Sequence, residues 1–138
     1  MDFLNVSGFG VLPGKNLEFQ AWVRANSVAL AQAMPKGIEL VGIYAAMFSS
    51  EKHSGDYKVI WRFDSYGAMD RFTAAMGEDP ELARLMDELG NFEDVRLGAD
   101  RSDELLKSVA DITIWADHPE ERATWLARIL HEAPDIRA

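Results

Sequence analysis

The chain has 138 residues, of which 48% are hydrophobic and 27% are charged, and its net charge is -9. This length is typical of a single domain, and the composition is that of an ordinary globular protein, which excludes a disordered chain and a collagen-like repeat. There is no cysteine, so disulfides, thiolate metal sites and a cysteine nucleophile are excluded as well.

The negative charge is concentrated in the second half of the chain. Residues 1–76 hold seven Lys and Arg and seven Asp and Glu, whereas residues 77–138 hold seven and sixteen. Such a surface repels a phosphate backbone, so we expect no nucleic-acid partner. The longest apolar run, residues 41–48, is far shorter than the roughly 20 residues that span a bilayer. No basic residue precedes Lys15, so we expect no secretory signal and a cytoplasmic protein.

The first half of the chain is predicted to form a strand, a helix and a hairpin. Residues 2–12 mix apolar residues with glycine and end at Pro13-Gly14, which predicts a strand closed by a turn. In residues 15–34 the apolar positions recur every three or four residues, the spacing of one buried helix face. Residues 38–48 and 56–64 are rich in β-forming residues and flank a polar stretch, which predicts a hairpin.

Two helices are predicted next. Ser65 is predicted to be the N-cap of a helix that carries Phe72. Asp79-Pro80 is typical of a helix start, with the capping residue followed by proline at the first helical position. Four apolar residues behind it share one helix face: Leu82, Leu85, Met86 and Leu89.

The last third of the chain is predicted to form one more strand and a helix. Residues 91–101 show no periodicity and are expected to form a loop, and residues 102–104 a short helical turn. The alternation of Ile112 and Ile114 with polar residues predicts the last strand over residues 108–116. A C-terminal helix is predicted within residues 117–138.

This order of elements predicts an α+β fold of the ferredoxin-like type. A right-handed crossover, with the third strand inserted between the first two, gives a four-stranded antiparallel sheet with helices on one face. Residues 1–138 are then a single domain, in which residues 117–138 form a C-terminal helical extension.

Alternation along the predicted strands separates two faces of the sheet. A uniformly apolar set is expected beneath the helices: Leu4, Val6, Val41, Ile43, Val59, Trp61, Phe63, Ile112 and Ile114. The other set mixes aromatic, polar and charged side chains: Asn5, Ser7, Phe9, Tyr44, Phe48, Lys58, Ile60, Arg62, Asp111, Thr113 and Trp115. Left open to water, this second face would be a larger apolar patch than a monomer usually tolerates, so we expect a homodimer.

Two sheets packed face to face would enclose an interior that is partly apolar and partly polar, as in a small-molecule pocket. The alternative is a plain dimer interface with buried polar groups that satisfy one another. In a pocket, Arg62 would bind an anionic or enolate oxygen, and Asp111 would orient it or act as a base. The alternative for this candidate catalytic pair is a structural ion pair.

Four further residues are candidates for binding a substrate. Asn5, Tyr44 and Trp115 belong to the mixed face. His53 is included because the hairpin loop that carries it could fold over the mouth of a barrel. No spacing of the histidines indicates a metal site, and there is no phosphate-binding glycine loop, so we expect no metal and no cofactor.

The order of elements resembles the dimeric α+β barrel superfamily. Pro13-Gly14-Lys15, before the first helix, and the segment Trp61-Arg62-Phe63-Asp64-Ser65-Tyr66 add to this resemblance, which covers about residues 2–116. The superfamily includes antibiotic-biosynthesis-monooxygenase-like, NIPSNAP-like and polyketide-cyclase-like domains. Its members include cofactor-free oxygenases, haem-degrading enzymes, cyclases and domains with no known reaction.

The haem-degrading type implies a site with Asn on the first strand, Trp near the end of the third and His on the second helix. Asn5 matches the first position. Trp61 or Phe63 lies near the second, although the face assignment above turns both toward the helices. Residues 65–89 contain no His, so this sequence departs from the haem-binding pattern.

Two functions of different class follow from these observations. The first is a small-molecule-binding dimer that acts as a cofactor-independent monooxygenase or cyclase on an aromatic or polyketide-like substrate. The second is a non-catalytic dimer that binds a small apolar or aromatic molecule or serves a structural role.

Overall fold

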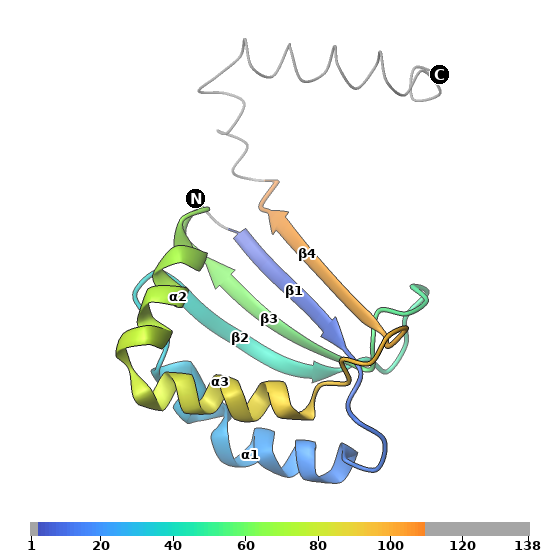
Figure 1. Cartoon of the computed structure of the whole chain (residues 1–138). Coiled ribbons are helices and arrows are strands. Elements are labelled where there is room, and N and C mark those ends of the chain that lie inside the picture. Colours follow the sequence, from blue (N-terminus) through green and yellow to red (C-terminus); the bar gives the residue numbers. More distant parts are fainter. Residues whose placement is uncertain (1–2, 110–138) are drawn as a thin grey trace, which may run out of the picture. The chain divides into compact units, whose positions relative to one another are not determined.

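In the computed structural model, which describes residues 3–109, three helices cover one face of a four-stranded sheet (Figure 1). The elements are β1 (Phe3–Phe9), α1 (Asn16–Gln32), β2 (Ile38–Ala45), β3 (Tyr57–Phe63), α2 (Ala68–Glu78), α3 (Pro80–Phe92) and β4 (Arg101–Lys107). The strand order is β2-β3-β1-β4, and β3 is antiparallel to both β1 and β2. The ferredoxin-like α+β fold is therefore confirmed, including the insertion of the third strand between the first two.

The chain divides into two compact units, residues 1–106 and residues 107–138. The helices and strands β1 to β3 lie within the first unit, as does β4 up to Leu106. The predicted C-terminal helix, within residues 117–138, lies outside the described residues.

The last strand lies earlier in the chain than predicted. β4 spans Arg101–Lys107, so the helical turn expected at residues 102–104 is wrong, and Ser108 and Val109 follow the strand instead of opening it. β4 is an edge strand and most of its residues are exposed, so it lacks the apolar alternation on which the prediction relied. The remainder of the predicted strand, residues 110–116, lies outside the described residues.

The core lies between the sheet and the helices. Its largest fully buried side chains come from β1, α1 and α3: Phe3, Phe19, Leu30, Leu82 and Leu85. The apolar face predicted for the helix behind Asp79 is confirmed, because Leu82, Leu85 and Leu89 are all buried and Met86 packs against the core.

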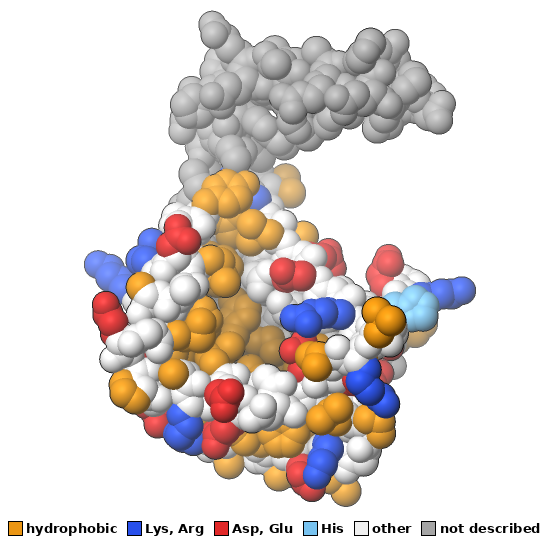
Figure 2. Space-filling model, in the orientation of Figure 1, with side chains coloured by type: hydrophobic (Ala, Val, Ile, Leu, Met, Phe, Trp, Pro, Cys, Tyr) orange, Lys and Arg blue, Asp and Glu red, His pale blue; other side chains and the backbone are white. Residues whose placement is uncertain are grey.

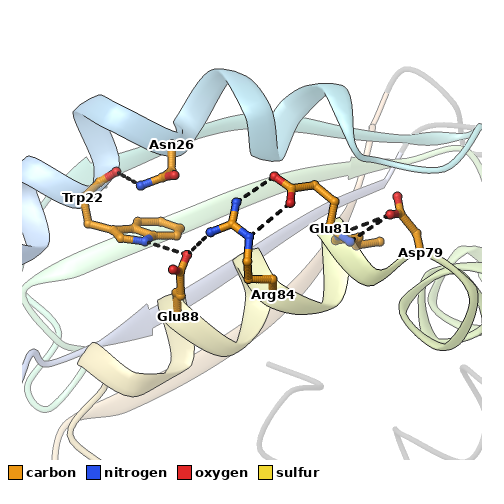
Figure 3. A network of polar contacts seen from close by, with 7 residues as sticks. Trp22, Asn26, Asp79, Glu81, Arg84 and Glu88 are labelled. Atoms are coloured by element: carbon orange, nitrogen blue, oxygen red, sulfur yellow. Dashed lines mark hydrogen bonds and ion pairs between the residues drawn. The ribbon is translucent and has the colours of Figure 1, made fainter.

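A row of polar contacts joins α1 to α3 (Figure 3). Arg84 donates to Glu81 and, through a 2.8 Å bond, to Glu88 Oε2. The same Glu88 oxygen accepts a hydrogen bond from Trp22 Nε1 of α1 at 3.3 Å. The hydrogen bond from Arg84 lowers the pKa of Glu81 below its ordinary value. The Trp22–Glu88 hydrogen bond is the contact of this row that connects α1 with α3, and the Arg84 contacts lie within α3.

The two helices after β3 begin in different ways. The predicted Ser65 cap is wrong, since α2 begins after Gly67 with no side-chain cap, and the Ser65 hydroxyl donates to Asp64 instead. The predicted start at Asp79-Pro80 is confirmed, because the Asp79 carboxylate accepts hydrogen bonds from the backbone N–H groups of Glu81 and Leu82.

We predict that Asp79→Ala lowers the free energy of unfolding by about 1 kcal/mol, the usual cost of removing such a cap. Urea denaturation measures the change. Asp87→Ala is the matched control, because Asp87 is exposed within α3 and its replacement alters the net charge equally. An equal loss in both variants would contradict the capping role.

Candidate functional site

A cavity of about 350 Å³ opens between the helix-covered face of the sheet and helices α2 and α3. In Figure 2 the molecule is hollowed here, with hydrophobic side chains along the bottom of the hollow. The apolar residues of the sheet that line it are Ile38, Trp61, Phe63 and Leu105. Those of the helices are Met69, Phe72 and Met86. The volume falls within the range of small-molecule pockets.

One wall of the cavity is polar and consists of Asn5, Ser7 and Asp103. Asn5 Nδ2 donates to Asp103 Oδ1 at 2.7 Å and to the backbone oxygen of Glu104 at 3.1 Å. The Ser7 hydroxyl lies 3.1 Å from Asn5 Oδ1 and 3.0 Å from Asp103 Oδ1. Side chains of β1 thereby hold the Asp103 carboxylate of β4 at the edge of an otherwise apolar space.

The pairing of β1 with β3 explains why Asn5 and Ser7 point into this cavity. Asn5 lies directly opposite Trp61, and Phe3 lies opposite Phe63, so these side chains share the helix-covered face. Phe3 and Phe9 are only 1% and 5% exposed. Burying each of them contributes about 1.5–3 kcal/mol. Because alternate residues share a face, that burial turns Asn5 and Ser7 the same way.

The face predicted for β1 was therefore wrong, although the grouping of its alternate residues was right. Asn5 lies on the helix-covered face and not on the open one, whereas Leu4 and Val6 lie opposite Arg62 and Ile60 on the open face. The large aromatic side chains at both ends of β1 outweigh the smaller Leu4 and Val6 in the competition for burial.

On β3 and β2 the predicted faces hold, with one exception. Val59, Trp61 and Phe63 are buried beneath the helices, as expected. The register of β2 shifts between Leu40 and Gly42, and the intervening Val41 is 37% exposed instead of buried. Such a bulge displaces one side chain from the regular alternation. Its position cannot be predicted from the hydrophobic pattern of the sequence.

The open face carries two of the predicted site residues. Arg62 forms an ion pair with Glu39 of β2, with NH1 3.0 Å from Oε2. Tyr44 is 49% exposed, and its ring lies so close to Gly42 that a Cβ there would be 2.8 Å from it. Arg62 and Tyr44 thus share a face with each other, but Asn5 is on the opposite side of the sheet.

The remaining predicted residues lie apart from the cavity or outside the description. His53 is in the loop between β2 and β3, where its exposed ring places Nδ1 3.0 Å from Asp100 Oδ1. Asp111 and Trp115 lie outside the described residues, so the proposed pairing of Arg62 with Asp111 stays a prediction.

The turn between β3 and α2 lines part of the cavity. Arg71 of α2 binds the Asp64 carboxylate, and its Nε donates to the backbone oxygen of Lys36 at 3.3 Å. The hydrogen bond from Arg71 lowers the pKa of Asp64 below its ordinary value. These contacts anchor the segment that contributes Ser65 and Tyr66 to the cavity, and the Tyr66 ring rests 4.6 Å from that of Phe3.

A smaller cavity of about 200 Å³ adjoins the first and shares Ser7, Trp61 and Met86 with it. Its charged lining residues, Arg101 of β4 and Glu93 after α3, face each other with Arg101 NH2 3.7 Å from Glu93 Oε1. The two charges offset one another, so this second space adds no net charge to the site.

Sequence reasoning missed Asp103, because it placed the last strand elsewhere. It assigned Trp61 to the core and considered it for a site only through the haem-degrading pattern. A usable signal was present in β1, where two polar residues alternate with Phe3 and Phe9. Large aromatic residues six positions apart on a strand share a face. Polar residues between them on that face are costly to bury without a hydrogen-bond partner, so they indicate a polar partner or a ligand.

The residues around the cavity do not fit haem. Asn5 and Trp61, which match two positions of the haem-degrading pattern, are cross-strand neighbours. However, neither α2 nor α3 contains a histidine that could bind the iron, and the charged lining residue is an acidic one, which repels the haem propionates. Among the described residues, no group of three or more His, Asp or Glu is placed to hold a metal ion.

Comparisons with known proteins connect this architecture with solved structures. No protein-family model matches the sequence, and no curated protein matches it. A NIPSNAP family protein from Agrobacterium tumefaciens superimposes with a TM-score of 0.59 at 13% identity, over 81% of this chain and 96% of that one. A dimeric ferredoxin-like protein of unknown function from Thermobifida fusca gives a TM-score of 0.55 at 13% identity, over 78% and 92%.

A third similar structure, from Bordetella bronchiseptica, is of a protein proposed to be an antibiotic biosynthesis monooxygenase. Its TM-score is 0.53 at 11% identity, over 78% of this chain and 97% of that one. The chain thus has the fold common to NIPSNAP and antibiotic-biosynthesis-monooxygenase-like proteins, and the resemblance to this superfamily is confirmed at the level of the fold. No helix in the described part of the chain has the length and apolar character of a membrane span.

Proposed function

We propose that the chain binds a small, largely apolar molecule between the sheet and helices α2 and α3, and that it acts there as a cofactor-independent monooxygenase or cyclase. The observation that carries the proposal is the cavity of about 350 Å³ with an apolar lining and the Asn5–Ser7–Asp103 wall. Such a combination binds the body of a ligand by burial and orients it through a few polar groups.

The aromatic residues Trp61, Phe63 and Phe72 suit an aromatic or polyketide-like substrate. Trp61 and Phe72 lie with ring centroids 5.8 Å apart at an interplanar angle of 56°, so the lining offers ring faces and ring edges. Aromatic molecules pack favourably against both. The partly exposed Met69 and Met86 add side chains that adapt to the shape of a ligand.

The chemistry proposed for this site begins with removal of an acidic proton from the substrate. The Asp103 carboxylate is the group of the cavity that can accept it, and Asn5 and Ser7 fix its position. In an oxygenation the resulting carbanion transfers electrons to O₂, a methylene becomes a carbonyl, and the second oxygen atom leaves as water with the two hydrogens. In a cyclisation the carbanion attacks a carbonyl of the same molecule and needs no oxidant.

We predict that Leu105→Trp weakens binding of 2-naphthol at least tenfold, because the larger side chain fills the cavity. Isothermal titration calorimetry measures the affinity. Leu97→Trp is the matched control, since Leu97 is fully exposed in the loop before β4 and lines neither cavity. Unchanged affinity in Leu105→Trp would place the ligand elsewhere.

Turnover separates the catalytic function from a non-catalytic binding domain. The substrate is anthrone, a tricyclic ketone that has an acidic methylene. We predict that the wild type takes up oxygen and forms anthraquinone. In Asp103→Asn the rate should fall at least a hundredfold, the usual size of a general-base contribution. Glu104→Gln, the neighbour that faces the other side of β4, keeps the wild-type rate. Absence of turnover in the wild type together with binding of 2-naphthol would favour the non-catalytic domain.

Arg62, on the open face of the sheet, and Asp111, outside the described residues, remain the second candidate pair. Arg62 is about half exposed and already paired with Glu39, so a substrate oxygen would have to displace or share that partner. In the anthrone assay, loss of turnover in Arg62→Ala with full activity in Asp103→Asn would transfer the chemistry to this face.

We further propose that the open face pairs with that of a second copy of the chain. It carries partly exposed apolar side chains from all four strands: Leu4, Val6, Tyr44, Ile60 and Leu106. The similar Thermobifida fusca protein is described as dimeric. Burial of such a face is the dominant favourable term in association.

We predict that Ile60→Glu converts a dimer into a monomer in light scattering after size exclusion, because a carboxylate on the central strand β3 would be buried without a partner. Leu17→Glu is the control, since Leu17 is 79% exposed on α1, away from the open face. A wild type that is monomeric at micromolar concentration would refute the dimer.

A further inference from the structure

We propose that the cavity selects its ligand by charge: it takes a neutral or cationic aromatic molecule that donates a hydrogen bond to Asp103, and it rejects carboxylates and phosphates. This inference rests on the proposed binding function and adds the class of ligand to it. It assigns to Asp103 the role of a specificity-determining residue, whether or not the bound molecule is turned over.

The first argument is the balance of charge around the cavity. Among the described residues that line it, Asp103 is the only charged one. Two cationic side chains beside the cavity are engaged elsewhere, because Arg71 binds Asp64 and Arg101 of the adjoining cavity faces Glu93. Lys58 lies on the other face of the sheet, where its Nζ donates to the backbone oxygen of Ser54 at 2.9 Å. An anion in the cavity would therefore meet a carboxylate, and none of the described lining side chains offers it a positive charge.

The second argument is the geometry of the Asp103 carboxylate. The hydrogen bonds from Asn5 and Ser7 both end at Oδ1, and neither uses Oδ2. An ionised carboxylate only accepts hydrogen bonds. A ligand group that contacts Oδ2 therefore forms a hydrogen bond only if it is a donor, such as a hydroxyl or an ammonium group, since two acceptors placed together do not bond.

The third argument is the aromatic lining. Trp61 lies directly across from Asn5, so an indole ring adjoins the polar wall. Aromatic ring faces attract cations, and tryptophan does so most strongly. An ammonium group near Asp103 would then be attracted by the carboxylate and by the ring together, whereas a carboxylate would be repelled by both.

The test uses three bicyclic probes that differ in one substituent: 2-naphthylmethylamine, which is cationic at pH 7, neutral 2-naphthol, and anionic 2-naphthoate. We expect the amine to bind the wild type most tightly and naphthoate at least tenfold more weakly than the amine, by isothermal titration calorimetry. In Asp103→Asn the amine should lose about tenfold in affinity, the difference between a charge-assisted and a neutral hydrogen bond, and naphthoate should gain.

Two further variants sharpen the result. Glu104→Gln removes the same charge from the opposite face of β4 and should leave the order of the three probes unchanged. Asp103→Lys should reverse the order, so that naphthoate binds more tightly than the amine. Circular dichroism and the affinity for 2-naphthol show whether each variant is folded and its cavity open.

The outcomes separate this inference from the proposed function on which it rests. Equal binding of all three probes by the wild type, or unchanged affinities for the amine and naphthoate in Asp103→Asn, would overturn the selection by charge and leave the binding cavity intact. Failure of all three probes to bind the folded wild type would overturn both.

Discussion

The candidate site depends on the register in which β1 pairs with β3. That pairing places Phe3 opposite Phe63 and Phe9 opposite Tyr57, and the burial of these four aromatic side chains fixes which face of β1 turns toward the helices. A shift by one residue would expose Phe3 and Phe9 and turn Leu4 and Val6 inward. The same constraint carries Asn5 and Ser7 onto the covered face, where the cavity and Asp103 lie.

Two polar side chains on a covered face are costly unless they find partners. Here Asn5 and Ser7 find them in β4, through Asp103 and the backbone oxygen of Glu104. The contacts connect the outermost strand to its neighbour and keep a carboxylate at the rim of an apolar space. These three residues thus have a structural role in joining the two strands, and the proposed function would give them a second role in binding a ligand.

The sequence predicted the order of elements and the position of β3 in the sheet, because both follow from periodicity and from topological rules that hold for most folds. It also predicted the start of α3, since Asp79 and Pro80 act locally. It could not predict β4, whose exposed residues become a strand only by pairing with β1. To predict which face of β1 is covered, the burial of Phe3 and Phe9 must be compared with that of Leu4 and Val6. These two sets of alternate residues have similar hydrophobicity, so the pattern alone does not decide between them.

The location of Asp103 on an edge strand links access to the site with the local stability of the fold. Within the described sheet β4 has a neighbour on one side only, and its side chains are largely exposed, so little apolar burial opposes its detachment. Transient release of this strand would remove the polar wall and widen the entrance for an incoming molecule. A molecule bound against Asp103 would in turn stabilise the state in which β4 is paired with β1. Ligand binding would therefore make transient opening of β4 less frequent.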